Sequence, residues 1–492
     1  MGWEFAVWAT VLVPLLGCFT LPLAGLVSKP LRNAWAVILG AATVGFACSL
    51  IPAAFSGETR VFNAAIGLGV EATLVVDGLS VFMAIVSSLV STLIIVYSLG
   101  YIKDYQYQQE YFLMVALFLG GMMGLVFSAN LILMYVFWEI TGICSWRLIG
   151  FFRDREIVVK ADKAFLVTFG GAVFMLLGFA MVYAQSGTFN LLEMRGLPIS
   201  GLAVALIAAG IFAKSATLPF HTWLPDAGVA PTPVTALLHA AVLVKIGVYA
   251  FARIFNYAFN LSGDAQTWLM VFGLVSAMVA ACAALWDTNI KRILAYSTIS
   301  QIGYIFMGLA AFNTVGIAGA ILFILMHGLA KGGLFLAAGV IEHGAGTKDI
   351  TRMGGLIKYM PVTAVAFLLC IFSIIGIPPF GGFFSKFMVI KGIVQSGNIA
   401  VASLAIFTAL LTAVYLMRLF TMIFLGEARD GSIHAHREGT PSMVWVVASL
   451  AILSLAAGIL VKYPMDLANI AVRDILGNPP WRAVRDIMGA LR

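Results

Sequence analysis

The stretch Ser-Ile-Ile-Gly-Ile-Pro-Pro-Phe-Gly-Gly-Phe-Phe-Ser-Lys, residues 373–386, decides what kind of fold this chain can have. It is an apolar segment, but two consecutive prolines interrupt it and a lysine ends it. Proline removes a backbone N–H donor and clashes with the preceding helical turn, so Pro378 and Pro379 predict a discontinuous helix. A second break of this kind surrounds Pro219, five residues after Lys214. The sequence therefore predicts two interrupted helices, each with a lysine close to its break.

The composition of the whole chain places these segments in a membrane. Of the 492 residues, 62% are hydrophobic and 10% are charged, whereas a soluble domain carries roughly 25% charged residues. A folded core cannot absorb so much apolar surface without leaving most of it in water. We therefore expect an integral, multi-pass membrane protein. The net charge of +7 implies no nucleic-acid partner, because basic residues in short loops are expected from membrane topology.

Apolar segments long enough to cross about 30 Å of hydrocarbon, which takes roughly 20 helical residues, recur along the chain. Only helices satisfy all of their own backbone groups in lipid, so the predicted fold class is all-α. Fourteen spans are expected, and the seventh and twelfth contain the proline breaks. The predicted spans are residues 3–27, 33–55, 78–100, 111–127, 130–150, 164–185, 200–216, 232–255, 266–286, 293–311, 315–341, 361–387, 398–424 and 441–461.

The two breaks lie five spans apart, which indicates two units of five helices. An odd number of helices per unit forces the second copy to be inverted relative to the first, and paired interrupted helices are typical of inverted-repeat transporters. The expected organisation is three N-terminal helices, two repeats, a last span and a tail. The corresponding residues are 1–110, 111–255, 266–424, 441–461 and 462–492.

Basic residues predict the orientation of these spans. The loops after odd-numbered spans hold sixteen of them, and the loops after even-numbered spans hold four, namely Arg60, Arg195, Arg253 and Lys391. The positive-inside rule then places the odd loops in the cytoplasm and both termini on the outer side of a prokaryotic cytoplasmic membrane.

The tail after the last span has an apolar pattern of its own. Its residues Ile470, Val472, Ile475 and Leu476 are consistent with a short amphipathic helix on the membrane surface or on a neighbouring protein. A frayed tail is the alternative.

Few charges fall inside the predicted spans, and these are the candidate functional residues. A lysine at the centre of a membrane helix costs about 2.5 to 3.5 kcal/mol, so four of them cost roughly 10 to 14 kcal/mol. One lysine near a helix end can extend to the headgroups or pair with a carboxylate, but four are hard to explain in this way. Desolvated lysine also releases its proton readily, which arginine does not. The intramembrane charges are Glu139, Lys214, Lys245, Lys331 and Lys386.

Two histidines extend this set. His327 and Lys331 are four residues apart, so they share one helix face. His239 and Lys245 are six residues apart, which corresponds to roughly 240° around an α-helix and predicts that they point to different sides. A lone buried histidine is more often a packed core residue, and only its proximity to a lysine favours a proton relay.

The sequence contains no sign of a cofactor. It has no haem-binding pair, no iron–sulfur spacing and no dinucleotide-binding glycine motif opening a helix. The five cysteines have no metal-like spacing and are expected to pack in the interior. We therefore expect no cofactor, no metal and no catalytic redox site in this chain.

Several motifs together resemble a known family. They are Phe137-Trp138-Glu139, the stretch from Lys214 through Pro219 to Ala227, and Gly376 to Lys386. They resemble the antiporter-like subunits of respiratory complex I, of energy-converting membrane-bound hydrogenases and of multisubunit Na+/H+ (Mrp-type) antiporters. The resemblance covers about residues 75–425 and implies fourteen core helices in two inverted repeats.

The resemblance also implies roles for individual residues. Glu139 and Lys214 would form a charge pair, His239 or Lys245 would be the relay of the eighth span, and Lys386 would lie on the exit side. His327 and Lys331 would be the relay of the eleventh span. The lysine at position 386 resembles that of the L-type subunits of complex I or the A-type subunits of antiporters, and a D-type-like subunit fits as well. Residues 170–172 are Gly-Gly-Ala where L-type subunits tend to carry an acid.

Three functions are compatible with these features. The leading hypothesis is a proton-translocating subunit of a complex I-like or hydrogenase-like assembly, driven by redox chemistry in other subunits. Its expected partners are other membrane subunits of the complex, of the antiporter-like kind and of the quinone or hydrogenase module. The second is the large subunit of a sodium/proton antiporter, which needs no redox module. The third, a membrane scaffold that no longer conducts ions, would leave four buried lysines without a use.

Overall fold

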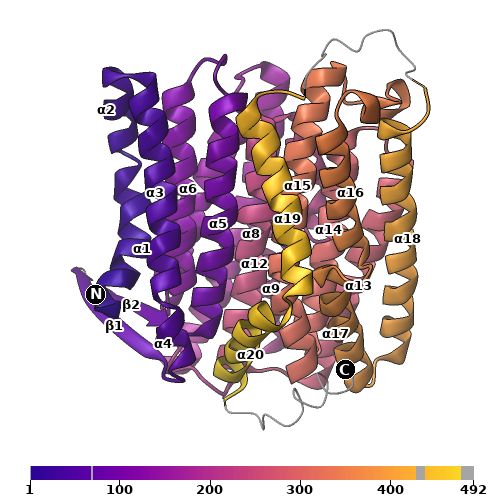
Figure 1. Cartoon of the computed structure of the whole chain (residues 1–492). Coiled ribbons are helices and arrows are strands. Elements are labelled where there is room, and N and C mark those ends of the chain that lie inside the picture. Colours follow the sequence, from indigo (N-terminus) through magenta and orange to yellow (C-terminus); the bar gives the residue numbers. More distant parts are fainter. Residues whose placement is uncertain (1, 68–69, 428–437, 478–492) are drawn as a thin grey trace.

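The computed structural model describes residues 2–67, 70–427 and 438–477, and it is almost entirely helical (Figure 1). Within these residues, eleven helical stretches are long and apolar enough to cross a membrane, and a bent pair makes twelve. Most of their axes run in a common direction (Figure 1). The uninterrupted spans are α5 (Gly78–Tyr101), α6 (Gln108–Phe127), α7 (Leu131–Ile149), α8 (Arg155–Ser186), α13 (Gly263–Trp286), α14 (Ile290–Ala310), α15 (Thr314–Ala345), α18 (Ile399–Phe424) and α19 (Pro441–Ile459).

The remaining long spans contain irregularities. The helices α1 (Trp3–Gly17) and α2 (Thr20–Val27) meet at 52°, and α3 (Lys29–Ser49) continues as the short α4 (Ile51–Phe55). The stretch 232–258 combines two α-helices with two π-helices. These are α11 (Thr232–Ala236), π-helix η3 (Leu237–Ala241), α12 (Leu243–Phe251) and π-helix η4 (Ala252–Ala258).

Both predicted helix breaks are present. The helix α9 (Gly201–Lys214) ends before Pro219, and the short elements η1 (Phe220–Thr222), α10 (Trp223–Asp226) and η2 (Ala227–Val229) follow it. The helix α16 (Pro361–Ile375) ends before Pro378 and Pro379, and α17 (Gly381–Gln395) begins after them. The two half-helices α9 and α16 are apolar but short. The all-α membrane fold and its discontinuous helices are confirmed, whereas the count of fourteen spans and the division into repeats stay predictions.

Local sequence explains where many helices begin. The side chains of Asn130, Asn289 and Asn313 each accept hydrogen bonds from backbone N–H groups at the start of α7, α14 and α15. Asp77 and Ser80 form a reciprocal capping box at the start of α5. These side chains satisfy N–H groups that have no partner inside the helix.

Short strands at one end of the bundle are an addition to the predicted fold. The strands β1 (Arg60–Gly67) and β2 (Val70–Val76) form an antiparallel hairpin beside α4 (Figure 1). A two-residue parallel pair joins β3 (Leu197–Pro198) to β4 (Phe259–Asn260). Single helical turns, η5 (Ile350–Arg352) and η6 (Leu356–Lys358), connect α15 to α16. The all-α prediction missed the hairpin because its two strands, of 8 and 7 residues, are far shorter than the roughly 20 residues by which membrane spans were recognised.

The most enclosed elements are α14, α15 and the stretch 232–258, whose side chains are nearly all buried. By contrast, α8 and α18 expose large apolar side chains such as Leu166 and Leu410. An apolar surface of this kind suits contact with lipid or with another membrane protein. The enclosed elements are therefore the ones that can hold buried charges away from lipid.

The predicted tail helix is present as α20 (Lys462–Leu476), beyond the last span. Its apolar face, including Ile470, Val472 and Ile475, is buried, and α20 packs against α5, α15 and η4 of the same chain. For these residues the structure excludes a frayed tail, because the segment is helical and its apolar face packs on the same chain. The basic residues Arg482 and Arg485 lie outside the described residues.

Candidate ion pathway

The first group of candidate residues lies where α9 ends against α7. Lys214 is the last residue of α9, and its Nζ donates a hydrogen bond of 2.9 Å to the carbonyl oxygen of Trp138. The same Nζ lies 5.3 Å from the centre of the Trp138 ring. The end of α9 thus places the Lys214 ammonium group against α7.

Glu139 faces the same space as Lys214. A Cβ atom added to Gly142 would lie 3.4 Å from Nζ of Lys214 and 3.7 Å from Oε2 of Glu139, so both charged groups border this glycine. They form no ion pair within 4.0 Å, and Oε1 of Glu139 makes no hydrogen bond within the described chain. The structure therefore brings the predicted pair together, with the lysine bonded to a carbonyl group and not to the carboxylate.

A hydrogen bond from a side chain to the backbone connects the region of Glu139 and Lys214 to the helix that carries Lys245. The Ser215 hydroxyl, directly after Lys214, donates a hydrogen bond of 3.0 Å to the carbonyl oxygen of Val244. Val244 precedes Lys245 on α12, and Nζ of Lys245 lies against Gly328 of α15, where an added Cβ would collide with it. This Nζ makes no hydrogen bond to a described residue. Lys245 is thus held against a glycine in the wholly buried part of the chain.

The helix α15 gathers most of the remaining candidates. His327 directly precedes Gly328, and Lys331 follows one turn later with its Nζ 3.1 Å from the carbonyl oxygen of Leu294. The His239 ring stacks on Phe335, with ring centres 4.3 Å apart. Both ring nitrogens of His239 and of His327 lack a hydrogen bond within the described residues. The helix α15 therefore carries His327 and Lys331 itself, and it is contacted by His239 and Lys245 from the stretch 232–258.

Lys386 lies at the second helix break. Its Nζ is 2.7 Å from the carbonyl oxygen of Ile374 and 3.4 Å from that of Ile375, at the end of α16. A helix C-terminus carries a partial negative charge and unpaired carbonyl groups, so it stabilises a cation. The same Nζ lies 5.0 Å from the centre of the Tyr304 ring and 5.8 Å from that of Phe323. Phe323 also contacts the ring of His327, which connects Lys386 to α15.

The angle predicted between His239 and Lys245 rests on an uninterrupted α-helix, and the structure corrects that assumption. His239 lies in the π-helix η3, and Val242 after it has φ −127° and ψ −71°, so the two residues belong to different helical segments. A π-helical turn carries an extra residue and shifts the phase of everything after it. Both side chains come to face α15, His239 at Phe335 and Lys245 at Gly328.

Few carboxylates accompany the row of buried charges that runs from Glu139 and Lys214 through Lys245 and Lys331 to Lys386. Among the described residues, Lys245, Lys331 and Lys386 take part in no ion pair, although each is at most 4% exposed. Buried like charges without a compensating acid repel one another. These three lysines are therefore buried cations for which the described residues supply no paired carboxylate.

Sequence reasoning missed two further buried ion pairs. Arg253, which the predicted topology places in a loop, lies inside η4 and is 1% exposed, and it forms two hydrogen bonds of 2.6 and 2.9 Å with Asp77. Lys291, predicted in a loop as well, begins α14 and pairs with Glu342 of α15 at 2.7 Å. No signal in the local sequence identifies these partners, because each pair joins residues far apart in the chain.

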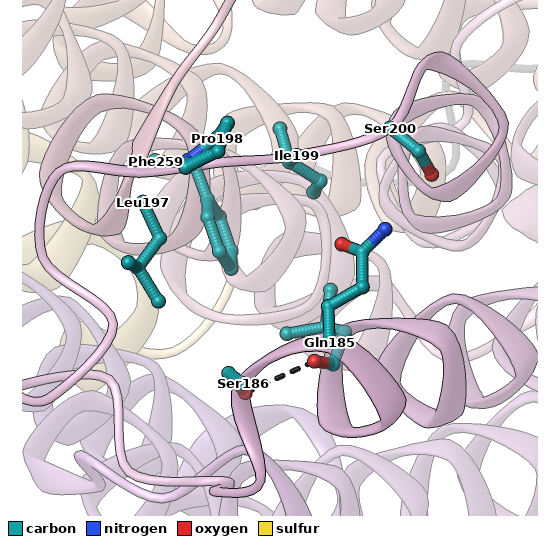
Figure 2. A pocket seen from close by; sticks show the side chains of 8 residues that line it. Gln185, Ser186, Leu197, Pro198, Ile199, Ser200 and Phe259 are labelled. Atoms are coloured by element: carbon teal, nitrogen blue, oxygen red, sulfur yellow. Dashed lines mark hydrogen bonds between the residues drawn. The ribbon is translucent and has the colours of Figure 1, made fainter.

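A hollow of about 430 Å³ lies away from the row, between the end of α8 and the segment that leads into α9. Figure 2 shows Leu197, Pro198 and Ile199 running across the end of the helix that carries Gln185 and Ser186. Its walls contain no charged side chain. We therefore do not count it as part of the ion pathway.

Comparison with known proteins shows the family of this chain. The family model described as "NADH:quinone oxidoreductase/Mrp antiporter, TM" matches residues 128–412, more than half of the chain. The chain belongs to this family. A second model, described as "NADH-Ubiquinone oxidoreductase (complex I), chain 5 N-terminus", matches residues 63–112.

Curated members of the family come from two kinds of complex. The A subunit of the Na(+)/H(+) antiporter of Alkalihalophilus pseudofirmus is 36% identical over 425 residues, which cover 78% of this chain and 52% of that protein. The L subunit of the NADH-quinone oxidoreductase of Mycobacterium tuberculosis is 35% identical over 476 residues, covering 92% of this chain and 74% of that protein. The chain thus spans only about half to three fifths of the antiporter A subunits that it matches.

Two solved structures share the fold along nearly the whole chain. One is a chain of the Mrp complex from Dietzia sp. DQ12-45-1b, with a TM-score of 0.88 and 25% identity, covering 99% of this chain and 100% of that one. The other belongs to the membrane-bound sulfane sulfur reductase, an archaeal respiratory membrane complex, with a TM-score of 0.87 over 96% of this chain and 97% of that one.

Proposed function

We propose that this chain is a proton-translocating membrane subunit of a larger complex, and that redox chemistry in other subunits drives it. The single observation that carries the proposal is the row of buried charges from Glu139 and Lys214 to Lys386, joined through Lys245 and α15. The family includes L subunits of NADH-quinone oxidoreductases, and the fold recurs in a respiratory membrane complex.

The mechanism follows from the electrostatics of the row. A carboxylate close to a lysine favours the protonated amine, and separating the two in a dry site favours release of the proton. Movement of Glu139 relative to Lys214 would therefore make Lys214 take up a proton from Lys245 and release it toward His327 and Lys331, which would pass it to Lys386. In this proposal the loops after odd-numbered spans face the cytoplasm, protons enter near Lys245, and they leave on the opposite side near Lys386.

The decisive experiment removes the proton-carrying group at position 214. Lys214→Met should abolish proton pumping by the purified complex in vesicles, because the side chain at position 214 can then carry no proton. Lys214→Arg should also fail, since arginine keeps its proton, although it restores the charge. Lys358→Met, at an exposed position, is the matched control and should pump normally.

The assembly of each variant must be measured alongside its transport. We expect Lys214→Met and Lys214→Arg to enter the complex at the normal level, as seen by native gel electrophoresis. Normal pumping by an assembled Lys214→Met complex would refute the mechanism.

A second candidate function is supported by the similarity to antiporter A subunits. In that case the chain would be the large subunit of a sodium/proton antiporter and would work without a redox module. Sodium-driven proton movement in vesicles that contain no electron donor would establish this function. Proton movement that requires electron transfer would establish the first. Mass spectrometry of the subunits that co-purify identifies which kind of partner is present.

A further inference from the structure

A pocket lined by several charged and polar residues lies outside the candidate pathway, at the opposite end of the bundle from the β-hairpin. It has a volume of about 720 Å³ and is formed by α2, the start of α3, the segment after α5 and the start of α6. In Figure 1 this is the upper end of the indigo helices, where α2 and α3 meet. The residues that line it are Pro22, Gly25, Lys29, Arg32, Tyr105, Gln106, Tyr107, Gln108, Gln109, Glu110 and Leu113.

Arg32 is the central charge of this pocket and has no acidic partner in the described structure. Its side chain is buried, with the residue 3% exposed, and its guanidinium lies 5.0 Å from the centre of the Phe112 ring. It donates hydrogen bonds only to neutral oxygens, those of Asn33 at 2.7 and 3.2 Å and of Gln108 at 2.9 Å. A buried guanidinium held by amides alone retains an unbalanced positive charge, which attracts an anion.

The one carboxylate on the pocket wall is already neutralised. Glu110 accepts a hydrogen bond of 2.6 Å from Arg153, and it is also paired with Arg147. Lys29, on the open side of the pocket, is exposed and takes part in no ion pair among the described residues. The pocket lining therefore retains two cations, Lys29 and Arg32, that have no acidic partner among the described residues, and its net charge is positive.

Exposed apolar side chains lie on the same two helices that form the pocket. Leu23, Leu26, Val27 and Leu31 are between 47% and 77% exposed. Basic pockets between membrane helices that adjoin exposed apolar surface match the two halves of a phospholipid, a charged headgroup and its acyl chains. A free phosphate ion would use the cations but would leave this apolar surface unused.

We propose that this pocket binds the phosphate headgroup of an anionic phospholipid, with Arg32 and Lys29 as its charged ligands and the acyl chains along α2 and α3. The proposal does not depend on the transport mechanism, because none of these residues belongs to the row from Glu139 to Lys386. By the predicted orientation, the lipid belongs to the cytoplasmic leaflet.

Native mass spectrometry of the purified complex provides the test, with phosphatidylglycerol and the zwitterionic phosphatidylcholine as the two probes. We expect phosphatidylglycerol to bind more tightly. Lys29→Gln should weaken its binding about fivefold, which corresponds to the loss of one cation near a membrane surface. Arg32→Gln should weaken it by at least as much. The control Arg155→Gln removes an exposed cation outside the pocket and should bind as the wild type does.

Lys29 is the safer variant because it is exposed, so its loss should not disturb folding, and transport by the complex should stay normal. Equal binding of the two lipids, or unchanged phosphatidylglycerol binding in Lys29→Gln, would overturn the proposal. Displacement of the lipid by millimolar inorganic phosphate would also overturn it, in favour of a free-anion site. A photo-crosslinker at Leu26 should capture lipid, and capture of a neighbouring protein in its place would overturn the proposal by showing that a protein covers the pocket.

Discussion

At the scale of single residues, this chain buries charge in two different ways. Arg253 and Asp77 are each almost fully buried and satisfy each other through two hydrogen bonds, and Nε of Arg253 also donates to the Tyr249 hydroxyl at 2.9 Å. The lysines of the candidate pathway bond to backbone carbonyl groups or to nothing in the described chain. The first arrangement is fully paired and suits a fixed structural role, whereas the second leaves groups that can change protonation.

Removing one partner of the Arg253–Asp77 pair should therefore lower the stability of the protein more than it lowers its proton transport. Arg253→Met leaves Asp77 buried and unpaired, which typically costs about 3 to 5 kcal/mol. The double variant Asp77→Leu/Arg253→Met should recover most of this loss. Lys103→Met, which removes an exposed pair with Asp104, should cost at most about 1 kcal/mol. Thermal unfolding of the purified protein measures all three, and equal stability of Arg253→Met and Lys103→Met would contradict this assignment.

The same pair has a pH dependence with a definite sign. Burial alone would raise the pKa of Asp77, but the attraction of Arg253 and the hydrogen bonds from Arg253 and Ser80 hold that pKa below its usual value. A carboxyl group with a lowered folded-state pKa stabilises the fold fully above its unfolded pKa of about 4. The contribution is lost as the pH falls through the folded-state pKa. Unfolding measured as a function of pH should show this loss in the wild type and not in Asp77→Leu/Arg253→Met.

At the scale of elements, α15 is the helix on which the candidate pathway depends. It carries His327 and Lys331, and its Gly328 makes room for the ammonium group of Lys245. The absence of a side chain at position 328 is what allows a lysine of α12 to reach the middle of another helix. Gly328 thus affects both how α15 packs against α12 and where the ammonium group of Lys245 lies.

Gly328→Ala should lower proton transport severalfold while the complex still assembles, because the added Cβ would displace Nζ of Lys245 from its position. That atom is the end of a flexible side chain, so the helix can accept the change without unfolding. Gly332→Ala is the matched control, since its Cβ would meet side-chain carbons at 3.3 Å or more. Transport rates in vesicles, normalised to the amount of assembled complex, provide the measurement. Equal rates for the two variants would contradict a role for the Lys245 position.

At the scale of the whole molecule, the C-terminal helix α20 fastens the end of the bundle that carries the β-hairpin. The backbone N–H of Gly78 donates a hydrogen bond of 2.8 Å to Oδ2 of Asp474, and Arg195 donates one of 3.0 Å to the carbonyl oxygen of the same residue. A helix that follows the last span thus contacts the start of α5 and the loop before α9. Segments separated by hundreds of residues meet at this point.

Loss of the buried face of α20 should loosen this end of the protein. Ile475→Ala removes a side chain that is 2% exposed and should cost about 2 to 5 kcal/mol. Tyr463→Ala, on the same helix but 69% exposed, should have little effect. Limited proteolysis should cut the Ile475→Ala protein near α20 faster than either the wild type or Tyr463→Ala. Equal cleavage rates would show that α20 is not held by this face.

The sequence by itself determined the membrane environment, the presence of many apolar membrane-spanning helices and both helix breaks. These features are local, because apolar length and proline chemistry act within one segment. It also identified Glu139 and the four lysines, since a charge in an apolar run is costly wherever the run packs. The roles of these residues in transport stay predictions.

Only the tertiary structure decided which of these residues meet. The π-helix at His239 changed the phase that a regular helix would give, and the partners of Arg253 and Lys291 came from distant spans. The unbalanced charge of Arg32 also became visible only when α2, α3 and α6 formed one pocket. Sequence periodicity describes the face that a helix buries, but it contains no information about which other helix covers that face. Long-range packing supplies that information, and for this chain it determines where the charges lie.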